Sequence, residues 1–394
     1  MKRCVICKGR GLCGREKCPI LERFYSIKDF NIGNSVFGAT PPSILVGHRF
    51  YPKVYMGILI PPEVHGEDAS IFNAPDKWLS MSIHDVVKYR SRLVRSNIRS
   101  HVRYMPSRIV SVMQECVLSS KPLDSEAWFE KPPKIELRFD DTLMPIGPSG
   151  SLKKLDVVDN PAVPRKVDKV VSDYDLGAES AIMELYKHRI DKEYITRLLS
   201  AGLLGIKRRL VPTRWAITAI EETIGRKLIK EILDFKIIDC FELFYCERLG
   251  NHFEILLIPT HYSYELVEIW MKNSLWSSEG SVIWDGEGTK PKRESPLGGG
   301  YYASRISVLE HLYNRRRQAS IFVVREVYPS YWAPLGSWVI SKTVSEAMKK
   351  EPEKFDSFEK AVARMESRLK TPRHKWLGKN IICGVLSQRT LFDY

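Results

Sequence analysis

Four cysteines near the start of the chain have the residue type and the spacing of a metal site. They form the pattern C-x2-C-x5-C-x4-C and are Cys4, Cys7, Cys13 and Cys18. Thiolates this close together can surround one tetrahedral ion, and Gly9, Gly11 and Gly14 allow tight turns between them. The pattern predicts one structural Zn2+. An iron–sulfur cluster needs the same four thiolates and is the alternative, followed by disulfides, which are typical of secreted proteins.

A row of cations on a predicted helix could contact a phosphate backbone. The stretch from residue 82 to residue 104 starts with the capping-box pattern Ser82-x-x-Asp85 and ends before a proline. Five cations of this helix would fall within an arc of roughly 80°, namely Lys88, Arg92, Arg95, Arg99 and Arg103. The row predicts nucleic-acid binding, and the alternative is an ordinary solvated helix face.

Three glycines before another predicted helix could present backbone amides to an anion. The sequence GGGYYASR occupies residues 298–305, and the helix dipole favours negative charge at such a start. A cation in the first turn opposes that dipole unless an anion binds nearby. We therefore predict an anion or nucleotide site from Arg214, Gly298, Gly299, Gly300 and Arg305. The alternative is a flexible linker and an ordinary helix. No catalytic motif identifies a nucleophile or a general base, so the catalytic residues are unknown and enzymatic activity stays open.

The last seven residues, QRTLFDY, combine a glutamine with apolar and aromatic side chains, although an unpacked terminus is usually polar. They resemble the peptide that docks on the DNA sliding clamp PCNA, in which Gln is followed by an aliphatic residue and then two aromatics. The resemblance places Gln388 in a polar pocket and Leu391 with an aromatic in a hydrophobic cleft. Tyr394 takes the first aromatic position, and Phe392 lies two residues earlier. A terminal strand packed on the core is the alternative.

The chain of 394 residues carries a net charge of +14, and that charge is clustered. Residues 1–20, 81–120 and 301–394 carry +5, +5 and +8, so the remainder is slightly acidic. Clusters of this kind favour a phosphate-rich partner, and the alternative is solubility alone. The apolar content is ordinary for a folded protein, and no signal peptide or membrane-length apolar run is found. We expect a soluble cytoplasmic protein near the nucleoid.

The alternation of strand-like and helical patterns predicts an α+β fold. Strands are expected at residues 44–46, 54–60, 134–139, 236–245, 253–259, 321–327 and 335–340. Helices are expected near residues 82–104, 178–202, 214–234, 263–273, 301–317 and 356–370. A Gly- and Pro-rich stretch from residue 280 to residue 300 suggests a boundary. We expect a zinc module at 1–22, an α/β body at 23–280, a C-terminal domain at 281–380 and a clamp-binding tail at 381–394.

The two terminal motifs in this order, with a basic α/β body between them, resemble the archaeal Nre DNA repair family of the NreA type. Shorter stretches share the resemblance, namely FGATPP at 37–42, PTRW at 212–215, GGYYA at 299–303 and RRQA at 316–319. The resemblance implies a DNA damage repair factor that binds PCNA through its last residues. It also implies a zinc finger at the four cysteines. The alternative function is a nucleotide-binding or nucleotidyl- or ADP-ribosyl-processing enzyme with its site at residues 298–305.

Overall fold

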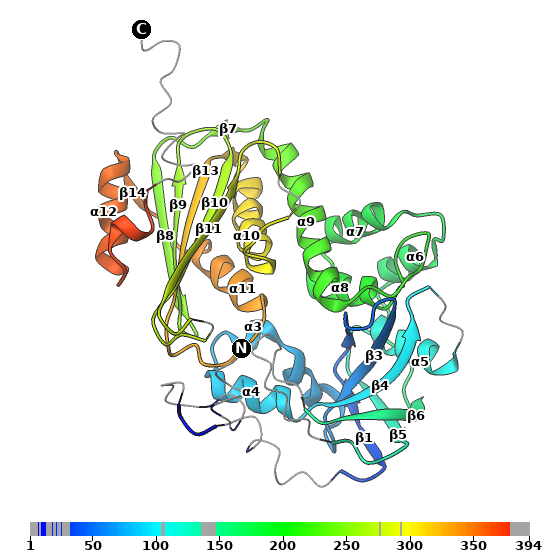
Figure 1. Cartoon of the computed structure of the whole chain (residues 1–394). Helices are drawn as coiled ribbons and strands as arrows, with labels where there is room; N and C mark the ends of the chain where they lie inside the picture. Colours follow the sequence, from blue (N-terminus) through cyan, green and yellow to red (C-terminus); the bar gives the residue numbers. More distant parts are fainter. Residues whose placement is uncertain are drawn as a thin grey trace. The chain divides into compact units, whose positions relative to one another are not determined.

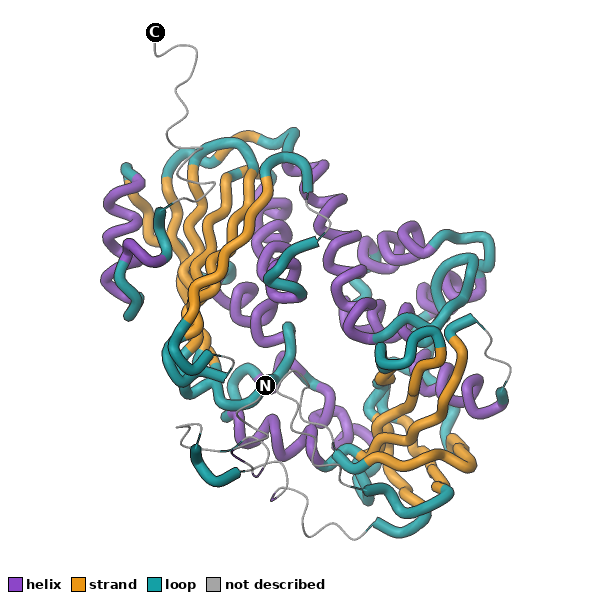
Figure 2. Tube along the Cα trace, in the orientation of Figure 1, coloured by secondary structure: helices purple, strands orange, loops and turns teal. Residues whose placement is uncertain are grey.

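The computed structural model describes residues 7, 9–12, 18, 21, 25, 32–103, 107–134, 147–275, 277–291 and 294–378. Two compact units meet at Ile224 and Gly225. We call residues 18–224 the first unit and residues 225–378 the second unit. Both combine helices with a β-sheet (Figures 1 and 2), which confirms the predicted α+β class. Among the described residues, no helix is long and apolar enough to cross a membrane.

The first unit is built on a six-stranded sheet with the order β1-β5-β6-β4-β3-β2. Only the β4–β6 pair is parallel. Alternating burial along β5 shows one face toward the core and the other toward a less covered side. The strands are β1 Ser35–Thr40, β2 Ile44–Val46, β3 Lys53–Ile60, β4 Val94–His101, β5 Leu123–Phe129 and β6 Ser149–Val157.

Most helices of the first unit are short, and side-chain caps begin α4, α5 and α8. Ser82 and Asp85 form the predicted capping box at the start of α4, and their hydrogen bond lowers the pKa of Asp85. The final helix, α9, runs across the boundary of the two units. The elements are η1 Gly66–Asn73, α3 Pro75–Trp78, α4 Ile83–Ser91, α5 Arg108–Leu118, α6 Arg165–Ser172, α7 Ala178–Lys187, α8 Lys192–Ser200 and α9 Thr213–Ile232.

The second unit holds another six-stranded sheet, with the order β11-β10-β13-β9-β8-β14. The β10–β13 pair is parallel and the others are antiparallel. A small parallel pair, β7 with β12, lies beside it. The strands are β7 Lys236–Ile237, β8 Phe241–Arg248, β9 Asn251–Ile258, β10 Ser263–Trp270, β11 Ser281–Glu287, β12 Arg317–Gln318, β13 Ser320–Val327 and β14 Glu353–Phe355.

Helices cover both faces of this second sheet. Figure 1 shows α10 and α11 on one face and α12 on the other. As a result, every residue of β9, β10 and β13 is buried. Leu256, Val267 and Phe322 pack with Met365 and Trp376 in an apolar core on the α12 side. The helices are α10 Gly299–Arg315, α11 Trp338–Ala347, α12 Phe358–Arg368 and η2 Arg373–Lys375.

Three of the predicted elements are wrong. The helix expected over 82–104 ends at Ser91, and β4 follows it, because cations four residues apart satisfy a strand period as well as a helix period. The helix expected over 263–273 is β10, whose residues are buried on both faces and so show no alternation. The strand expected over 335–340 contains the start of α11 at Trp338.

The remaining predicted elements agree with the structure apart from their ends and two breaks. The strand expected over 236–245 is two strands, β7 and β8, with residues 238–240 between them. The helix expected over 178–202 is two helices, α7 and α8, which are separated by Arg189 at φ +58°. Residues 135–139 of one predicted strand lie outside the described residues. The domain boundary predicted after residue 280 falls within the second sheet, where β10 and β11 pair.

Candidate nucleic-acid interface

Three stretches of the first unit carry cations but no acidic residue. They span residues 30–62, 86–114 and 194–220. Between residues 18 and 224 there are 29 Lys and Arg and 25 Asp and Glu, and these stretches hold 14 of the cations. All of the acidic residues lie elsewhere. The positive charge of this unit is therefore concentrated, although its net charge is only +4.

Backbone hydrogen bonds bring the three acid-free stretches together at one side of the first sheet. The amide of Val46 donates to the hydroxyl of Thr213 over 2.9 Å. The amide of Leu210 donates to the carbonyl of Val102 over 3.0 Å, and the amide of Val102 donates to the carbonyl of Pro52 over 3.0 Å. The start of α9, the loop before β3 and the end of β4 are thus neighbours.

The exposed cations of this region project from paired strands and the loops beside them. In the β3–β4 pair, Tyr55 lies opposite Arg99 and Lys53 lies opposite His101. Residues directly opposite share a face, and Val54 between them is fully buried on the other face. We call the exposed cations around this face the basic patch; they are Arg49, Lys53, Arg99, Arg103 and Arg214.

The cations of the basic patch are largely uncompensated. Within the described part of the chain, no carboxylate forms an ion pair with Lys53, Arg99, Arg103 or Arg214. Exposed cations without carboxylate partners produce a positive electrostatic potential at the protein surface, where phosphates can bind. This arrangement can bind a polyanion.

The five cations predicted to form one helical row occupy four different settings. Lys88 is exposed on α4, Arg92 caps that helix, and Arg103 follows β4. The single row is therefore wrong. Arg95 and Arg99 still share one face of β4 because they are an even number of residues apart. Only Arg99 and Arg103 belong to the basic patch, and the binding of DNA by all five stays a prediction.

In the first unit, Arg90, which is buried, and Arg197, which is half-buried, donate hydrogen bonds to neutral groups. Burial lowers the pKa of Arg90 and of Arg197 to about 10. Arg197 donates to the carbonyls of Val117, over 3.1 Å, and Ser119, over 2.9 Å. Arg90 lies 5.7 Å from the ring centre of Trp78 and donates to the amide oxygen of Asn73 over 3.4 Å. Carbonyls, an amide and rings hold these guanidinium groups.

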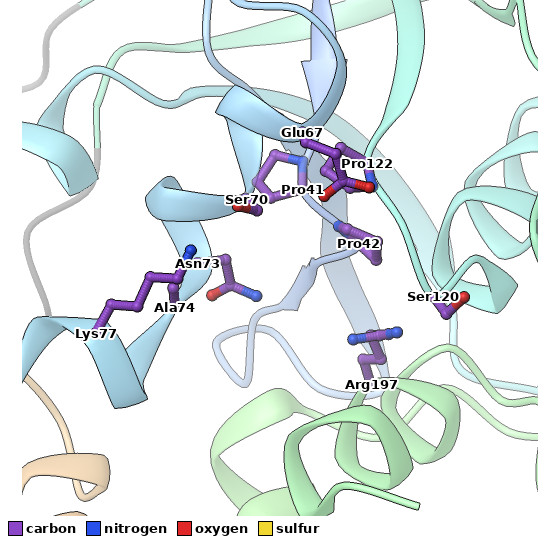
Figure 3. Close-up of a pocket in the computed structure, with 10 residues that line it drawn as sticks. All are labelled: Pro41, Pro42, Glu67, Ser70, Asn73, Ala74, Lys77, Ser120, Pro122 and Arg197. Carbon is purple, nitrogen blue, oxygen red and sulfur yellow. The ribbon is translucent and has the colours of Figure 1, made fainter.

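A cavity of about 230 Å³ lies beside these arginines in the first unit. Figure 3 shows its wall, to which η1 contributes Glu67 and Asn73, α3 contributes Lys77 and α8 contributes Arg197. Pro42, from the stretch at 37–42 that resembles the archaeal family, lines it as well. Both signs of charge meet in this wall, so its charge alone selects no ligand.

The glycine-led segment of the second unit has a different environment from the basic patch. Gly298, at φ +58°, precedes α10, and Gly300 allows close approach to the carboxylate of Glu268. Arg305 is fully buried, and its Nη1 donates to Glu287 over 2.7 and 2.9 Å. Its charge is therefore neutralised inside the fold. Arg214 belongs to the first unit, and a nucleotide site here stays a prediction.

A tyrosine completes the buried pair at Glu287. The hydroxyl of Tyr262 donates to Glu287 over 2.9 Å. Burial, followed by the negative charge of Glu287, raises the pKa of Tyr262 well above its ordinary value. The hydroxyl thus stays protonated as a donor. A second buried pair joins Arg325 to Glu268 over 2.6 Å, so two arginines of this interior are paired with carboxylates.

The predicted metal ligands are described only in part. Cys4 and Cys13 lie outside the described residues, whereas Cys7 is buried and Cys18 is half-buried. The amide of Arg10 donates to the carbonyl of Cys7 over 2.8 Å. Gly9 and Gly11 have φ of +83° and +77°, which confirms tight turns at these glycines. The described residues hold no group of three His, Cys, Asp or Glu placed for a metal, and zinc stays a prediction.

The clamp-binding tail and two cations of the basic patch are the remaining differences between the predicted and the observed site. The clamp-binding residues lie outside the described part of the chain; they are Gln388, Leu391, Phe392 and Tyr394. Sequence reasoning also missed Arg49 and Lys53, which flank an exposed loop. The sequence does indicate these two cations, because no acidic residue occurs between residues 30 and 62. Net charge counted over fixed windows does not show this acid-free stretch.

Comparison with known proteins shows similarity along nearly the whole chain. Residues 12–277 match the family described as archaeal Nre, N-terminal, and residues 287–394 match archaeal Nre, C-terminal. The DNA repair protein NreA of Archaeoglobus fulgidus is 41% identical over 93% of this chain and 94% of its own length. NreB of the same organism is 34% identical over 99% of both chains. NreA of Haloferax volcanii is 33% identical over 92% of this chain and 89% of its own. No solved structure matches the chain.

Proposed function

This chain belongs to the archaeal Nre family, and on that premise we propose that it is a DNA repair factor that contacts DNA through the basic patch of its first unit and is recruited by the sliding clamp. The repair role rests on relatives named DNA repair proteins that align over nearly their full length. The contact with DNA rests on one observation: three acid-free stretches meet at the exposed cations of the basic patch, and within the described part of the chain Lys53, Arg99, Arg103 and Arg214 have no carboxylate partner.

The physics of the DNA contact is counterion release. Each cation that neutralises a phosphate displaces a condensed counterion, so the logarithm of affinity falls linearly with the logarithm of salt concentration. Cations that already have internal carboxylate partners add little to this term. The exposed members of the basic patch are thus the residues expected to set the salt slope. A binding titration at increasing salt tests this proposal, and a flat response contradicts it.

Recruitment by the clamp rests on the terminal peptide at residues 388–394. A tail tethered to a clamp raises the local concentration of a modestly binding body at DNA. In the full chain, Gln388→Ala combined with Leu391→Ala is expected to weaken clamp binding at least about tenfold, because both side chains are anchors of the motif. Thr390→Ala, a spacer position, is the matched control. Undiminished binding by the double variant, measured by calorimetric titration against an archaeal clamp, contradicts the assignment.

We also propose that Cys4, Cys7, Cys13 and Cys18 hold one structural zinc ion. The support is the spacing of the cysteines and the tight turns at Gly9 and Gly11. Elemental analysis of the purified chain is expected to find about one zinc per molecule, lost in Cys7→Ser. Iron with visible absorbance in place of zinc would support the cluster alternative.

A further inference from the structure

Four aromatic side chains of the first unit are exposed beside the basic patch. They are Phe50, Tyr51, Tyr55 and Trp215, with exposed fractions of 65%, 50%, 40% and 46%. Rings of this size usually lose most of their surface to the core. We call these four residues the aromatic platform.

The platform brings together residues that are distant in sequence. The ring centres of Tyr51 and Trp215 lie 5.3 Å apart, so the loop before β3 contacts the start of α9. The ring of Phe50 lies 6.4 Å from that of Tyr55, which projects from β3. Phe50 also has φ +64°, a conformation that a bulky residue rarely adopts. The loop thus holds its two rings toward solvent beside the two neighbouring elements.

Cations are interleaved with these rings. The guanidinium carbon of Arg99 lies 5.9 Å from the ring centre of Phe50. Lys53 and Arg214 adjoin the same loop and the same helix start in sequence, and both are exposed. No acidic residue occurs in any of the three stretches that supply the platform and these cations. Anionic side chains therefore do not oppose a phosphate ligand from these segments.

Another exposed aromatic shows that exposure alone does not make such a surface. Tyr245 on β8 is 43% exposed. Its ring stacks on His252 at 6.0 Å and is approached by Arg368 at 4.5 Å. Arg368 in turn pairs with Glu254 at 2.7 Å, and Lys350, whose Nζ lies 5.1 Å from the same ring centre, donates to the carbonyl of Tyr245. The platform differs because it gathers four exposed rings, whereas Tyr245 stacks on a buried histidine.

We propose that the aromatic platform binds single-stranded DNA by stacking on its bases, a refinement that rests on the proposed contact between the basic patch and DNA. Bases in a duplex stack on one another and hide their faces, whereas a single strand leaves them open to rings. Cations along the backbone path supply affinity without sequence preference. Rings interleaved with unpaired cations therefore suit a single strand better than a duplex. A duplex would present its phosphates to the cations but no open base face to the rings.

The test compares single-stranded with double-stranded DNA of the same length, using the full chain and a fluorescent thymidine oligonucleotide of about 20 nucleotides, longer than one binding site. Trp215→Ala is expected to weaken single-strand binding about five- to a hundredfold, the range for loss of one stacked base. Binding to the duplex is expected to change by less than about twofold. Trp215→Phe, which keeps a stacking surface, is expected to restore most of the affinity.

The matched control is Trp284→Ala, because Trp284 on β11 is 44% exposed but lies in the second unit. Unfolding curves of both variants report whether the fold is intact. The stacking proposal is overturned if Trp215→Ala loses affinity equally for both DNA forms, or loses none. In either case, salt-dependent binding of the duplex would still support the proposed function. If neither DNA form binds the wild-type chain, the proposed function itself fails. Tighter binding of an oligouridine than of the oligothymidine would make RNA the partner instead.

Discussion

The two units carry the same net charge but use it in opposite ways. Residues 18–224 hold 29 Lys and Arg against 25 Asp and Glu, and residues 225–378 hold 24 against 20, which is +4 in each case. In the second unit the arginines pair with carboxylates. The pairs include Arg248–Glu346, Arg305–Glu287, Arg315–Glu242, Arg325–Glu268, Arg364–Glu353, Arg368–Glu254 and Arg373–Glu359.

Arg197 and Arg208 of the first unit bind carbonyls and aromatic rings instead. Arg197 donates to two carbonyls and lies 3.6 Å from the ring centre of Tyr194. Arg208 donates to the carbonyls of Val171 and Asp173 and lies over the ring of Tyr174. These partners orient a guanidinium without cancelling its charge. The comparison teaches that net charge does not show whether a unit has a binding surface. The partners of each cation show whether its charge is available to a ligand.

The largest effect expected from this difference is on the stability of the second unit. Glu287→Gln keeps the shape of the side chain but removes the negative charge that pairs with Arg305, which is fully buried. Removing one partner of a buried pair costs about 3–5 kcal/mol. We expect a loss of this size in the unfolding free energy, measured by urea unfolding and by hydrogen exchange in peptides from β10 and β13.

A surface pair of the first unit is the control for that substitution. Glu184 pairs with Lys166 on the solvent side, where water and salt screen the interaction. Glu184→Gln is expected to leave stability unchanged within error. If Glu287→Gln is as mild as this control, the second unit does not depend on internal pairing, and the contrast between the units fails.

A smaller effect on the stability of the second unit is expected when the pH is raised. Burial opposes the charged form of His252, but hydrogen bonds and negative charge from Glu254 and Glu247 outweigh it and raise the pKa of His252. A raised pKa in the folded state stabilises the fold below the unfolded value of about 6.5, and that stabilisation is lost as pH rises through the folded value. We expect β9 to lose stability as pH rises above about 6.5 and through the raised folded-state value.

The check is the pH dependence of the urea midpoint, with exchange measured in β9 peptides after correction for intrinsic rates. His252→Gln is expected to flatten the profile over this range. His65 of the first unit, whose contact with Asp124 is partly exposed, supplies the control His65→Gln. A flat wild-type profile, or equal slopes in the two variants, would show that the pairing at His252 is not coupled to folding.

Much of the fold could be predicted from local pattern. The apolar runs at 321–327 and 253–259 give β13 and β9, and the capping box at Ser82 starts α4 as expected. Patterns fail where tertiary context removes the usual period. β10 is buried on both faces and carries the buried acids Glu265 and Glu268, so its apolar spacing looks helical.

The candidate site was predictable in its residue types but not in its geometry. Arg99 and Arg103 could be identified as candidate DNA contacts, although on a helix rather than on a strand and the turn after it. Phe50 and Trp215 are 165 positions apart in the chain. Only the pairing of β3 with β4, and the contacts of the start of α9 with the loop before β3, bring their segments together. Internal neutralisation of Arg305 by Glu287 likewise depends on the sheet, so the sequence alone overstates the free charge of residues 301–394.

The central claim is that the unpaired cations of the first unit contact DNA phosphates. Its most direct test is the salt slope of DNA affinity in two variants with equal loss of charge. Arg99→Gln with Arg103→Gln is expected to reduce the slope of log affinity against log salt by about two, close to one unit for each lost phosphate contact. Lys349→Gln with Lys354→Gln, which removes exposed cations of the second unit, is expected to leave it unchanged. Equal slopes in the two variants would contradict the account.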